Sequence, residues 1–338
     1  MGYRTSLAIP FLLLASSLVT CVTAVYRPVR EYKGSTFFDK WYFAGKIDDS
    51  TFGNVYYLDR AQATSKRLAY INSAGNAIMK VDDKTYIPPT SPNQVHRGSI
   101  RITSKDTYDA GSLIVLDVRH IPWGCSLWPA FWTIGSGTWP NGGEIDIIEA
   151  INLMGFNQYA VHTGPGCTID TRHSHTGRVT GINCATPSGC VVEETKPNSY
   201  AAGFAQAGGG VYATKLDVSG IYIWFWSRPN IPNNIKTATA KSTLDSSSWG
   251  PPSLAIPSTT CNYTKFFTAQ QLVFTTTLCG GWAGNPGIYN LTCHTRTGSC
   301  VNDNVVGSGS NYDNAYWEVS YIRTYAAAGS PADIPTSD

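Results

Sequence analysis

The stretch Gly143-Glu144-Ile145-Asp146-Ile147-Ile148-Glu149 places three carboxylates within six residues, among isoleucines that predict a buried β-strand. The chain has 338 residues and only six glutamates, two of which lie in this run. Acidic side chains at apolar, β-branched positions cost free energy unless they are paired or used in chemistry. The run therefore predicts a catalytic site built from two carboxylates on a strand.

The spacing of the three acids makes a structural prediction. Side chains on a strand alternate between its two faces, so Glu144 and Asp146 share one face while the isoleucines beside them point into the core. Strict alternation would turn Glu149 into that core. We therefore predict a β-bulge at Ile147-Ile148, which returns Glu149 to the face of the other two acids.

Three carboxylates on one face fit the needs of retaining glycoside hydrolysis. That reaction uses two carboxyl groups about 5–5.5 Å apart, one as nucleophile and one as acid/base. Like charges so close cannot all ionise cheaply, so at least one should keep its proton at mildly acidic pH. The alternatives are an exposed polar face of an edge strand and a calcium site. The sequence offers no metal-ligand set to name, and we expect no metal and no cofactor.

Four tryptophans precede the acids, at positions 123, 128, 132 and 139. A sugar ring has apolar C–H faces that pack on indole, so Trp128 and Trp139 are predicted to bind substrate. Trp132 fits the core better, because large apolar residues alternate along 127–132. His162 lies on the next predicted strand, and an antiparallel hairpin would bring it beside Glu149, where it would also contact substrate.

Short β-branched or alternating runs recur along the chain, with Gly, Pro, Asn and Asp clustered between them. This pattern predicts an all-β sandwich of antiparallel sheets. Two long segments, 164–210 and 227–260, are expected to be ordered loops. The predicted strands are residues 41–44, 55–58, 77–81, 99–103, 112–118, 158–162, 210–213, 221–226, 271–274 and 316–325.

Several features predict a secreted protein. Residues 1–24 read as a signal peptide, with Arg4 before an apolar run and Val22-Thr23-Ala24 as the cleavage site. Eight of the nine cysteines lie beyond it, enough for four disulfides in any of 105 pairings. Asn262 and Asn290 begin glycosylation sequons, expected on surface loops.

Charge and length limit the kinds of partner and the domain organisation that the sequence predicts. Only 14% of residues are charged and the net charge is +2, which gives no footprint for nucleic acid or an anionic membrane. A neutral, hydroxyl-rich partner such as a polysaccharide suits the 12% of aromatic residues better. We expect residues 25–338 to form one catalytic domain with a short polar C-terminal tail, without a membrane anchor and as a monomer.

Two motifs, Leu127-Trp-Pro-Ala-Phe-Trp-Thr133 and Trp139-Pro-Asn-Gly-Gly-Glu-Ile-Asp-Ile-Ile-Glu149, resemble glycoside hydrolase family 16, in particular its fungal laminarinase-like endo-β-1,3(4)-glucanases. The resemblance covers essentially the whole chain after residue 24. It implies a curved, concanavalin-like jelly roll of two antiparallel sheets, with a substrate cleft across the concave face. It also implies hydrolysis of β-1,3 and mixed β-1,3/1,4 glucans.

The resemblance implies roles for individual residues. Glu144 would be the nucleophile and Glu149 the acid/base, with Asp146 between them to orient the nucleophile. His162 stands where the family has a histidine near the acid/base, and Trp282 corresponds to an aromatic residue along the cleft. A transglycosylase with the same intermediate and a non-catalytic glucan-binding lectin are the alternatives.

Three positions depart from the family pattern: Lys215-Leu216 replaces Glu-Trp, Gly281 replaces Asp, and Tyr56 replaces Asn. We expect these departures to alter contacts with the sugar rather than the chemistry.

Overall fold

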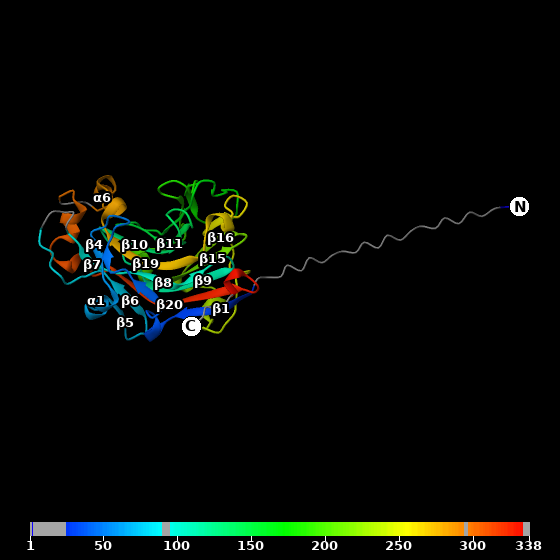
Figure 1. Cartoon of the computed structure of the whole chain (residues 1–338), viewed down its shortest axis with the longest axis horizontal. Coiled ribbons are helices and arrows are strands. Elements are labelled where there is room, and N and C mark those ends of the chain that lie inside the picture. Colours follow the sequence, from blue (N-terminus) through cyan, green and yellow to red (C-terminus); the bar gives the residue numbers. More distant parts are fainter. Residues whose placement is uncertain (1, 3–24, 90–94, 294–296, 334–338) are drawn as a thin grey trace.

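The computed structural model describes residues 2, 25–89, 95–293 and 297–333 (Figure 1). The predicted signal peptide, apart from residue 2, lies outside these residues. Two large antiparallel sheets face each other, and each of the ten predicted strand runs overlaps an observed strand. The predicted β-sandwich is therefore confirmed. Among the described residues, no helix combines the length and apolar character needed to cross a membrane.

The first sheet has nine strands. Seven of them form a continuous path, and the other two, β5 and β6, join it through β20. In spatial order the path is β17 (Leu244–Asp245), β1 (Val25–Tyr32), β20 (Tyr316–Ala327), β9 (Ser112–His120), β15 (Gly210–Asp217), β16 (Gly220–Ser227) and β18 (Leu254–Pro257), with β5 (Ala69–Ile71) and β6 (Ala77–Lys80) beside it.

The second sheet has eight strands and contains the acidic run in β11, which has three strands on one side and four on the other. Its order is β13 (Arg178–Gly181), β14 (Cys190–Glu193), β12 (Gln158–His162), β11 (Glu144–Glu149), β10 (Leu127–Ile134), β19 (Gln270–Leu278), β8 (Arg101–Tyr108) and β2 (Trp41–Phe43). A small third sheet holds β3 (Lys46–Ile47), β4 (Val55–Tyr57) and β7 (Arg97–Ser99). Because β11 is not an edge strand, the alternative of an edge-strand polar face is wrong.

Helices are short, as the lack of helical periodicity in the sequence indicates. They are α1 (Arg60–Ser65), α2 (Ala201–Gln206), α3 (Asn233–Lys236), α4 (Tyr263–Phe266), α5 (Gly280–Ala283) and α6 (Pro286–Cys293). Single turns of other helix types are η1 (Gly34–Thr36), η3 (Arg228–Asn230), η4 (Val301–Val305), η5 (Gly309–Tyr312) and η6 (Pro331–Asp333).

The main core lies between the two large sheets. Phe131, Ile145 and Phe274 come from the eight-stranded sheet, and Trp317 and Phe225 come from the nine-stranded sheet; all are fully buried. The rings of Phe274 and Trp317 meet edge to face with centroids 5.1 Å apart. Burial of each such side chain stabilises the fold by roughly 1.5–3 kcal/mol, and this contact fixes one sheet over the other.

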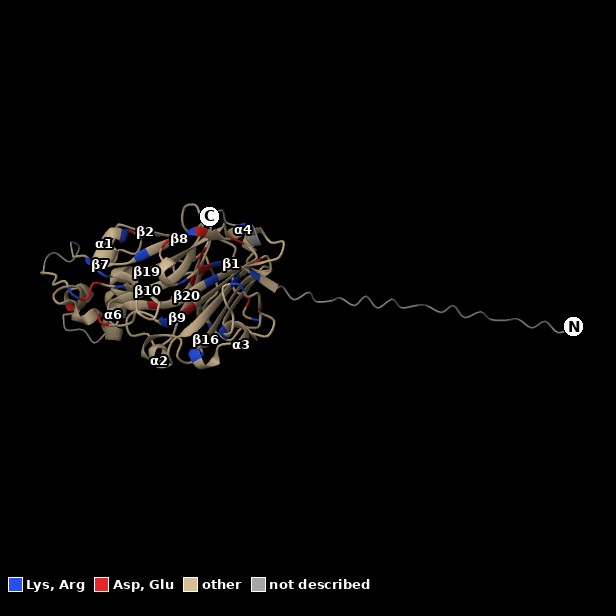
Figure 2. Ribbon diagram, turned by 90° about the horizontal axis from the view of Figure 1, so that it is seen from below, with Lys and Arg blue, Asp and Glu red and all other residues tan. Residues whose placement is uncertain are grey.

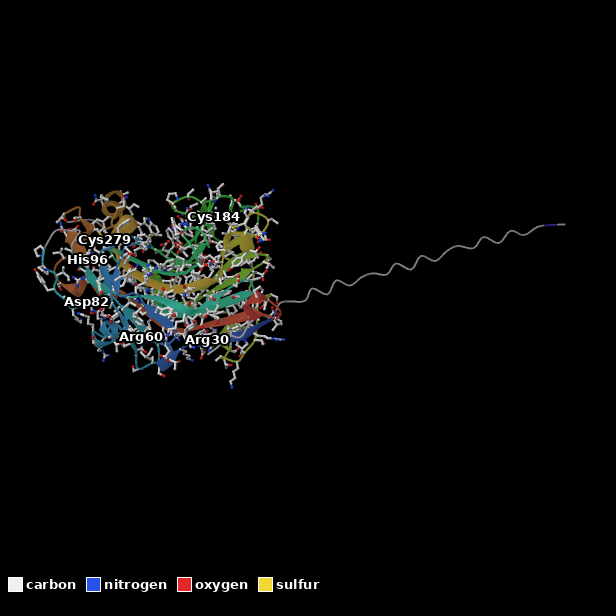
Figure 3. All side chains as sticks on the ribbon, in the orientation of Figure 1. Arg30, Arg60, Asp82, His96, Cys184 and Cys279 are labelled. Atoms are coloured by element: carbon white, nitrogen blue, oxygen red, sulfur yellow. A yellow bond between two sulfur atoms is a disulfide. The ribbon has the colours of Figure 1, made fainter. Side chains whose placement is uncertain are left out.

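Four disulfides form, as the eight cysteines beyond residue 24 predict. They are Cys125–Cys293, Cys167–Cys261, Cys184–Cys190 and Cys279–Cys300. The labelled Cys184 and Cys279 lie on the two sides of the upper edge of the molecule in Figure 3.

The long segments 164–210 and 227–260 contain short strands and helices of their own. Figure 2 shows basic and acidic residues interspersed over the ribbon.

Candidate active site

Strand β11 contains the predicted β-bulge. In its pairing with β10, Phe131 lies opposite Ile148 and Trp132 lies opposite Asp146, so Ile147 has no residue of its own across from it. The pairing with β12 shifts in the same interval. Both isoleucines are buried. The bulge at Ile147-Ile148 is therefore confirmed.

The bulge brings the three acids to one side of the sheet. Glu144, Asp146 and Glu149 lie opposite Ile134, Trp132 and Ala130, which are alternate residues of β10. Alternate residues of a strand share a face, so their partners do as well. We call this side of the eight-stranded sheet, away from the main core, the acidic face.

His162 lies on the acidic face, but at the opposite end of the hairpin from the position expected. It pairs with Glu144, whereas Glu149 pairs with Gln158. In an antiparallel hairpin the last residue of the second strand returns to the first residue of the first strand, so the expectation that His162 lies beside Glu149 is wrong. Its Nε2 is 3.4 Å from Oδ2 of Asp146 and 4.0 Å from Oε1 of Glu144.

Two tryptophans donate hydrogen bonds to the glutamates. Nε1 of Trp128 lies 2.8 Å from Oε1 of Glu149, and Nε1 of Trp139 lies 3.1 Å from Oε2 of Glu144. Trp139 is 51% exposed, and Trp128 is half-buried. The ring of Trp282 meets Trp128 edge to face with centroids 5.4 Å apart. The three tryptophans predicted to bind substrate are thus next to the acids or next to one another.

Burial raises the proton affinity of all three acids. Burial first, and then the charge of Asp146, raise the pKa of Glu149 to about 8, against the hydrogen bond from Trp128, which lowers it. Burial also raises the pKa of Asp146. The pKa of Glu144 is raised by burial and by Asp146, and His162 opposes that shift. Protons are therefore shared within the group, and at least one carboxyl stays neutral near pH 7.

The same cluster has the donor types that bind a metal ion. Ligand atoms of Glu144, Asp146 and His162 lie within 4.8 Å of one another. Carboxylate and imidazole are ligands for several divalent ions. The set forms because His162 pairs with Glu144, at the end of the hairpin opposite to the one expected from the sequence.

Trp132 also lies on the acidic face, because it pairs with Asp146. The expectation that it belongs to the core is wrong. Its Nε1 donates to Oγ1 of Thr275 at 2.9 Å, and the guanidinium of Arg101 stacks over its ring at 5.2 Å. The sequence does indicate this position, because side chains alternate along a strand. Trp132 is four residues from Trp128, an even number, so the two share a face of any regular strand.

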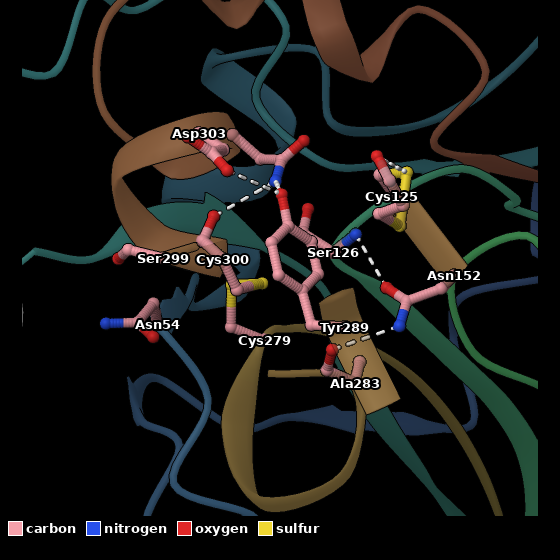
Figure 4. Close-up of a disulfide and its surroundings, with 12 residues drawn as sticks. Asn54, Cys125, Ser126, Asn152, Cys279, Ala283, Tyr289, Ser299, Cys300 and Asp303 are labelled. Atoms are coloured by element: carbon pink, nitrogen blue, oxygen red, sulfur yellow. Dashed lines mark hydrogen bonds between the residues drawn. A yellow bond between two sulfur atoms is a disulfide. The ribbon is translucent and has the colours of Figure 1, made fainter. Parts of the chain in front are cut away.

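The turn that carries Trp282 is strongly fixed, as the close-up in Figure 4 shows for its neighbours. Cys279 precedes α5, has a φ of 59° and forms the disulfide with Cys300. The buried side chain of Asn152 accepts from the backbone N–H of Ser126 and donates to the carbonyl of Ala283. Trp282 therefore projects from a short helix held at both ends.

The three departures from the family pattern lie in different places. Lys215 and Leu216 belong to β15 of the nine-stranded sheet, where the ammonium of Lys215 lies over the ring of Tyr222 and Leu216 is buried. The expectation that they alter sugar contacts is wrong, because that strand is in the other sheet. Tyr56 donates to the carbonyl of Gly45, and Gly281 directly precedes Trp282.

Both sequon asparagines are exposed; Asn262 lies in the loop just before α4, as expected, whereas Asn290 lies on a short helix rather than a loop. Asn262 is the N-cap of α4, where its side chain accepts from the backbone N–H of Lys265. Asn290 lies within α6. A sequon specifies a glycosylation site but not the secondary structure around it, so it does not predict the helical position of Asn290.

The chain is similar to known proteins along most of its length. The model described as the XgeA-like catalytic domain of glycoside hydrolase family 16 matches residues 41–325. A probable glycosidase of Schizosaccharomyces pombe is 38% identical in an alignment over 307 residues that covers 89% of this chain and 69% of that protein. The endo-1,3(4)-beta-glucanase of Arthroderma benhamiae is 36% identical in an alignment over 331 residues that covers 95% of this chain and 69% of that protein.

Solved structures give the same picture. Laminarinase 16A from Phanerochaete chrysosporium, solved with beta-glucans in its donor and acceptor sites, superposes with a TM-score of 0.82 at 37% identity over 89% of this chain and all of that one. An elongating family 16 beta-1,3-glucosyltransferase superposes with a TM-score of 0.80 at 35% identity, with the same coverage. The jelly-roll sandwich, the acidic strand and these matches all agree, and the chain is a member of glycoside hydrolase family 16.

Proposed function

We propose that this glycoside hydrolase is an endo-acting enzyme that cleaves β-1,3 and mixed β-1,3/1,4 glucans with retention of anomeric configuration. The observation that carries the proposal is the bulge in β11, which brings Glu144, Asp146 and Glu149 to one face beside three tryptophans. The names of the Arthroderma and Phanerochaete relatives support a β-glucan as substrate. The reaction needs no cofactor.

In the first step, a carboxylate of Glu144 attacks the anomeric carbon while Glu149 gives its proton to the leaving oxygen. The raised pKa of Glu149 keeps that proton in place at neutral pH, as a general acid requires. Burial and the charge of Asp146 raise the pKa of Glu144 too, while His162 and the hydrogen bond from Trp139 oppose that shift and favour the ionised form that attacks. The product of this step is a covalent glycosyl-enzyme.

In the second step, Glu149 removes a proton from water, which attacks the anomeric carbon and releases Glu144. Asp146 lies between the two glutamates in the strand, within reach of His162. Its role is to orient Glu144 and to raise the proton affinity of both neighbours. Trp128, Trp139 and Trp282 offer ring surfaces on which the apolar faces of glucose units pack.

The test is the variant Glu144→Gln, assayed by reducing ends released from laminarin, lichenan and cellulose in parallel. We expect loss of hydrolysis by at least about 1,000-fold with a Tm that is not lowered. The matched control is Glu318→Gln, which alters a carboxylate of β20, in the nine-stranded sheet, that accepts from the side chains of Asn72 and Asn76. NMR of the first product should show the β-anomer. Turnover of Glu144→Gln at the wild-type rate, or a first product of α configuration, would contradict the mechanism.

Transfer to a second sugar is the other candidate, because a 35% identical neighbour is an elongating glucosyltransferase. Both reactions use the same glycosyl-enzyme, and they differ in whether water or a sugar hydroxyl attacks it. Mass spectrometry of products from a defined laminari-oligosaccharide separates them: hydrolysis gives only shorter chains, and transfer gives chains longer than the donor. Binding of laminarin without any product would identify a lectin.

We also propose that the chain is secreted after cleavage at residue 24, that residues 25–338 act as one catalytic domain, and that Asn262 and Asn290 carry glycans. The four disulfides and the exposure of both asparagines support an extracellular location. Expression in a fungal host tests this. We expect monomeric protein in the medium, an N-terminus at Val25 and a mass that falls after enzymatic removal of N-glycans.

A further inference from the structure

Phe52 is an exposed aromatic residue that no role in the fold explains. Its side chain is 79% exposed, and its φ is 57°, in the left-handed region that is unfavourable for a residue with a bulky side chain. A strained, exposed aromatic residue points to a function, since the fold gains little from it.

The loop that carries Phe52 is built around a buried carboxylate. Asp48 accepts from the backbone N–H groups of Ser50, Thr51 and Gly53, and from Oγ1 of Thr277 at 2.6 Å. Burial would raise the pKa of Asp48, but the hydrogen bonds from Thr277 and Thr51 outweigh it and hold that pKa below its ordinary value. The carboxylate therefore stays ionised and fixes residues 48–53.

This loop lies on the acidic face. Thr277 pairs with Trp128 across β19 and β10, and Trp128 lies on the acidic face, so the side chain that binds Asp48 lies there too. From the same loop, Ser50 accepts from the guanidinium of Arg101, which stacks over Trp132. The loop thus lies above β19 and β8, next to two tryptophans of the acidic face.

Phe52 is also tied to the turn that carries Trp282. The carbonyl of Thr51 accepts from the N–H of Gly281 at 2.9 Å, and Gly53 forms a bridge with Cys279. A Cβ atom on Gly53 would lie 1.7 Å from Oγ1 of Thr277, so the contact requires glycine. Residues on both sides of Phe52 are therefore bonded to the segment 279–281, which fixes Phe52 beside the Trp282 turn.

We infer that Phe52 is a glucan-binding residue, which extends the sugar-binding surface from Glu149 through Trp128 and Trp282 to the loop 48–53. The inference rests on the proposed function. Aromatic faces pack against the C–H faces of glucose, and a rigid, already strained loop loses little entropy on binding. Glu149 bonds to Trp128, Trp128 packs against Trp282, and the Trp282 turn bonds to Thr51, so we expect Phe52 to contact a glucose unit further from the cleaved bond than the unit at Trp128. Its contribution therefore grows with the length of the chain.

Steady-state kinetics with a long and a short substrate test the inference. In Phe52→Gly we expect KM for laminarin to rise about 5- to 10-fold with kcat retained, and the kinetics with 4-nitrophenyl β-laminaribioside to stay unchanged. Phe52→Tyr should restore KM. Glycine tolerates the φ of this position, so the Tm of Phe52→Gly should stay the same or rise. The matched control is Val218→Ala, another exposed apolar residue, in the turn between β15 and β16.

A binding measurement separates this inference from the proposed mechanism. Affinity electrophoresis in laminarin gels compares Glu144→Gln with the double variant Glu144→Gln/Phe52→Gly, and neither needs turnover. We expect the double variant to bind several-fold more weakly. Equal binding by the two proteins overturns the role of Phe52 even if hydrolysis is confirmed. A lower Tm in Phe52→Gly, or equal KM increases for the long and the short substrate, overturns it as well.

Discussion

The indole N–H of Trp128 lies 2.8 Å from Oε1 of Glu149, a contact between neighbouring strands β10 and β11. The same indole ring meets Trp282 edge to face. One side chain therefore influences the proton affinity of a carboxyl and also forms part of the surface on which we propose that sugar binds.

Replacement of Trp128 by Phe removes the donor and keeps an aromatic ring. The hydrogen bond lowers the pKa of Glu149, so its loss should raise that pKa and move the alkaline fall in kcat/KM to higher pH. We expect activity at the optimum to fall about 3- to 10-fold. The control is Trp132→Phe, which loses a bond to Thr275 rather than to a carboxylate. Its alkaline limb should not move; if it moves as far as that of Trp128→Phe, the explanation is wrong.

The variant Asp146→Asn should move the pH profile in the opposite direction. The charge of Asp146 raises the pKa of Glu149, and a neutral amide removes that charge. Glu149 then loses its proton at lower pH, so the alkaline limb of kcat/KM moves to lower pH. We expect the maximal rate to fall roughly tenfold or more, since Glu144 loses the carboxylate that we propose orients it. An unchanged or upward-shifted alkaline limb would show that Asp146 does not act through charge.

Stability should depend on pH through Glu149. Its pKa is about 8 in the folded protein against an ordinary value of 4.5, so the folded state keeps a proton that the unfolded state has lost. The free energy of unfolding therefore falls as pH rises from about 4.5 to about 8. Glu149→Gln cannot ionise and should be more stable than the wild type at pH 8, by about 1–3 kcal/mol, with little difference at pH 4.5. Thermal unfolding at the two pH values measures this, and an equal difference at both would contradict it.

The disulfide Cys279–Cys300 should support both stability and sugar binding. It closes a loop of 21 residues and precedes the helix that carries Trp282. We expect the variant Cys279→Ala/Cys300→Ala to lose about 3 kcal/mol of stability and to have a higher KM for laminarin. The comparison is Cys184→Ala/Cys190→Ala, which opens a loop of six residues. That variant should lose less stability, and the Cys279→Ala/Cys300→Ala variant should show the larger rise in KM.

Much of the site could be predicted because strand alternation is a strict rule. Glu149 had to leave the core, and this requirement alone located the bulge. The same rule, applied from Trp128 to Trp132, would have placed Trp132 on the acidic face. Residue type alone does not show this, because large apolar residues occur on both sides of a sheet next to an aromatic substrate site. The prediction that His162 lies beside Glu149 is wrong because the two strands run in opposite directions, so the end of β12 returns to the start of β11.

Other contacts could not be predicted from local patterns. Thr51 and Gly281 are bonded although 230 positions separate them. Their meeting depends on the pairing of β19 with its neighbours and on a disulfide whose connectivity was one of 105 choices. The loop around Asp48 likewise has no sequence motif, because its partner Thr277 is a common residue type in a distant strand.

The bulge also makes β11 tolerant of a change in length. Elsewhere in a strand, a single inserted or deleted residue turns over every side chain that follows. At Ile147 the partners on β10 run from Trp132 directly to Phe131, so loss of one codon there would leave Ile148 in the core and Glu149 still opposite Ala130. A chain with or without that residue therefore keeps Glu149 on the same face as Glu144. The strand thus has one position at which a residue can be added or removed while all three acids stay on the same face.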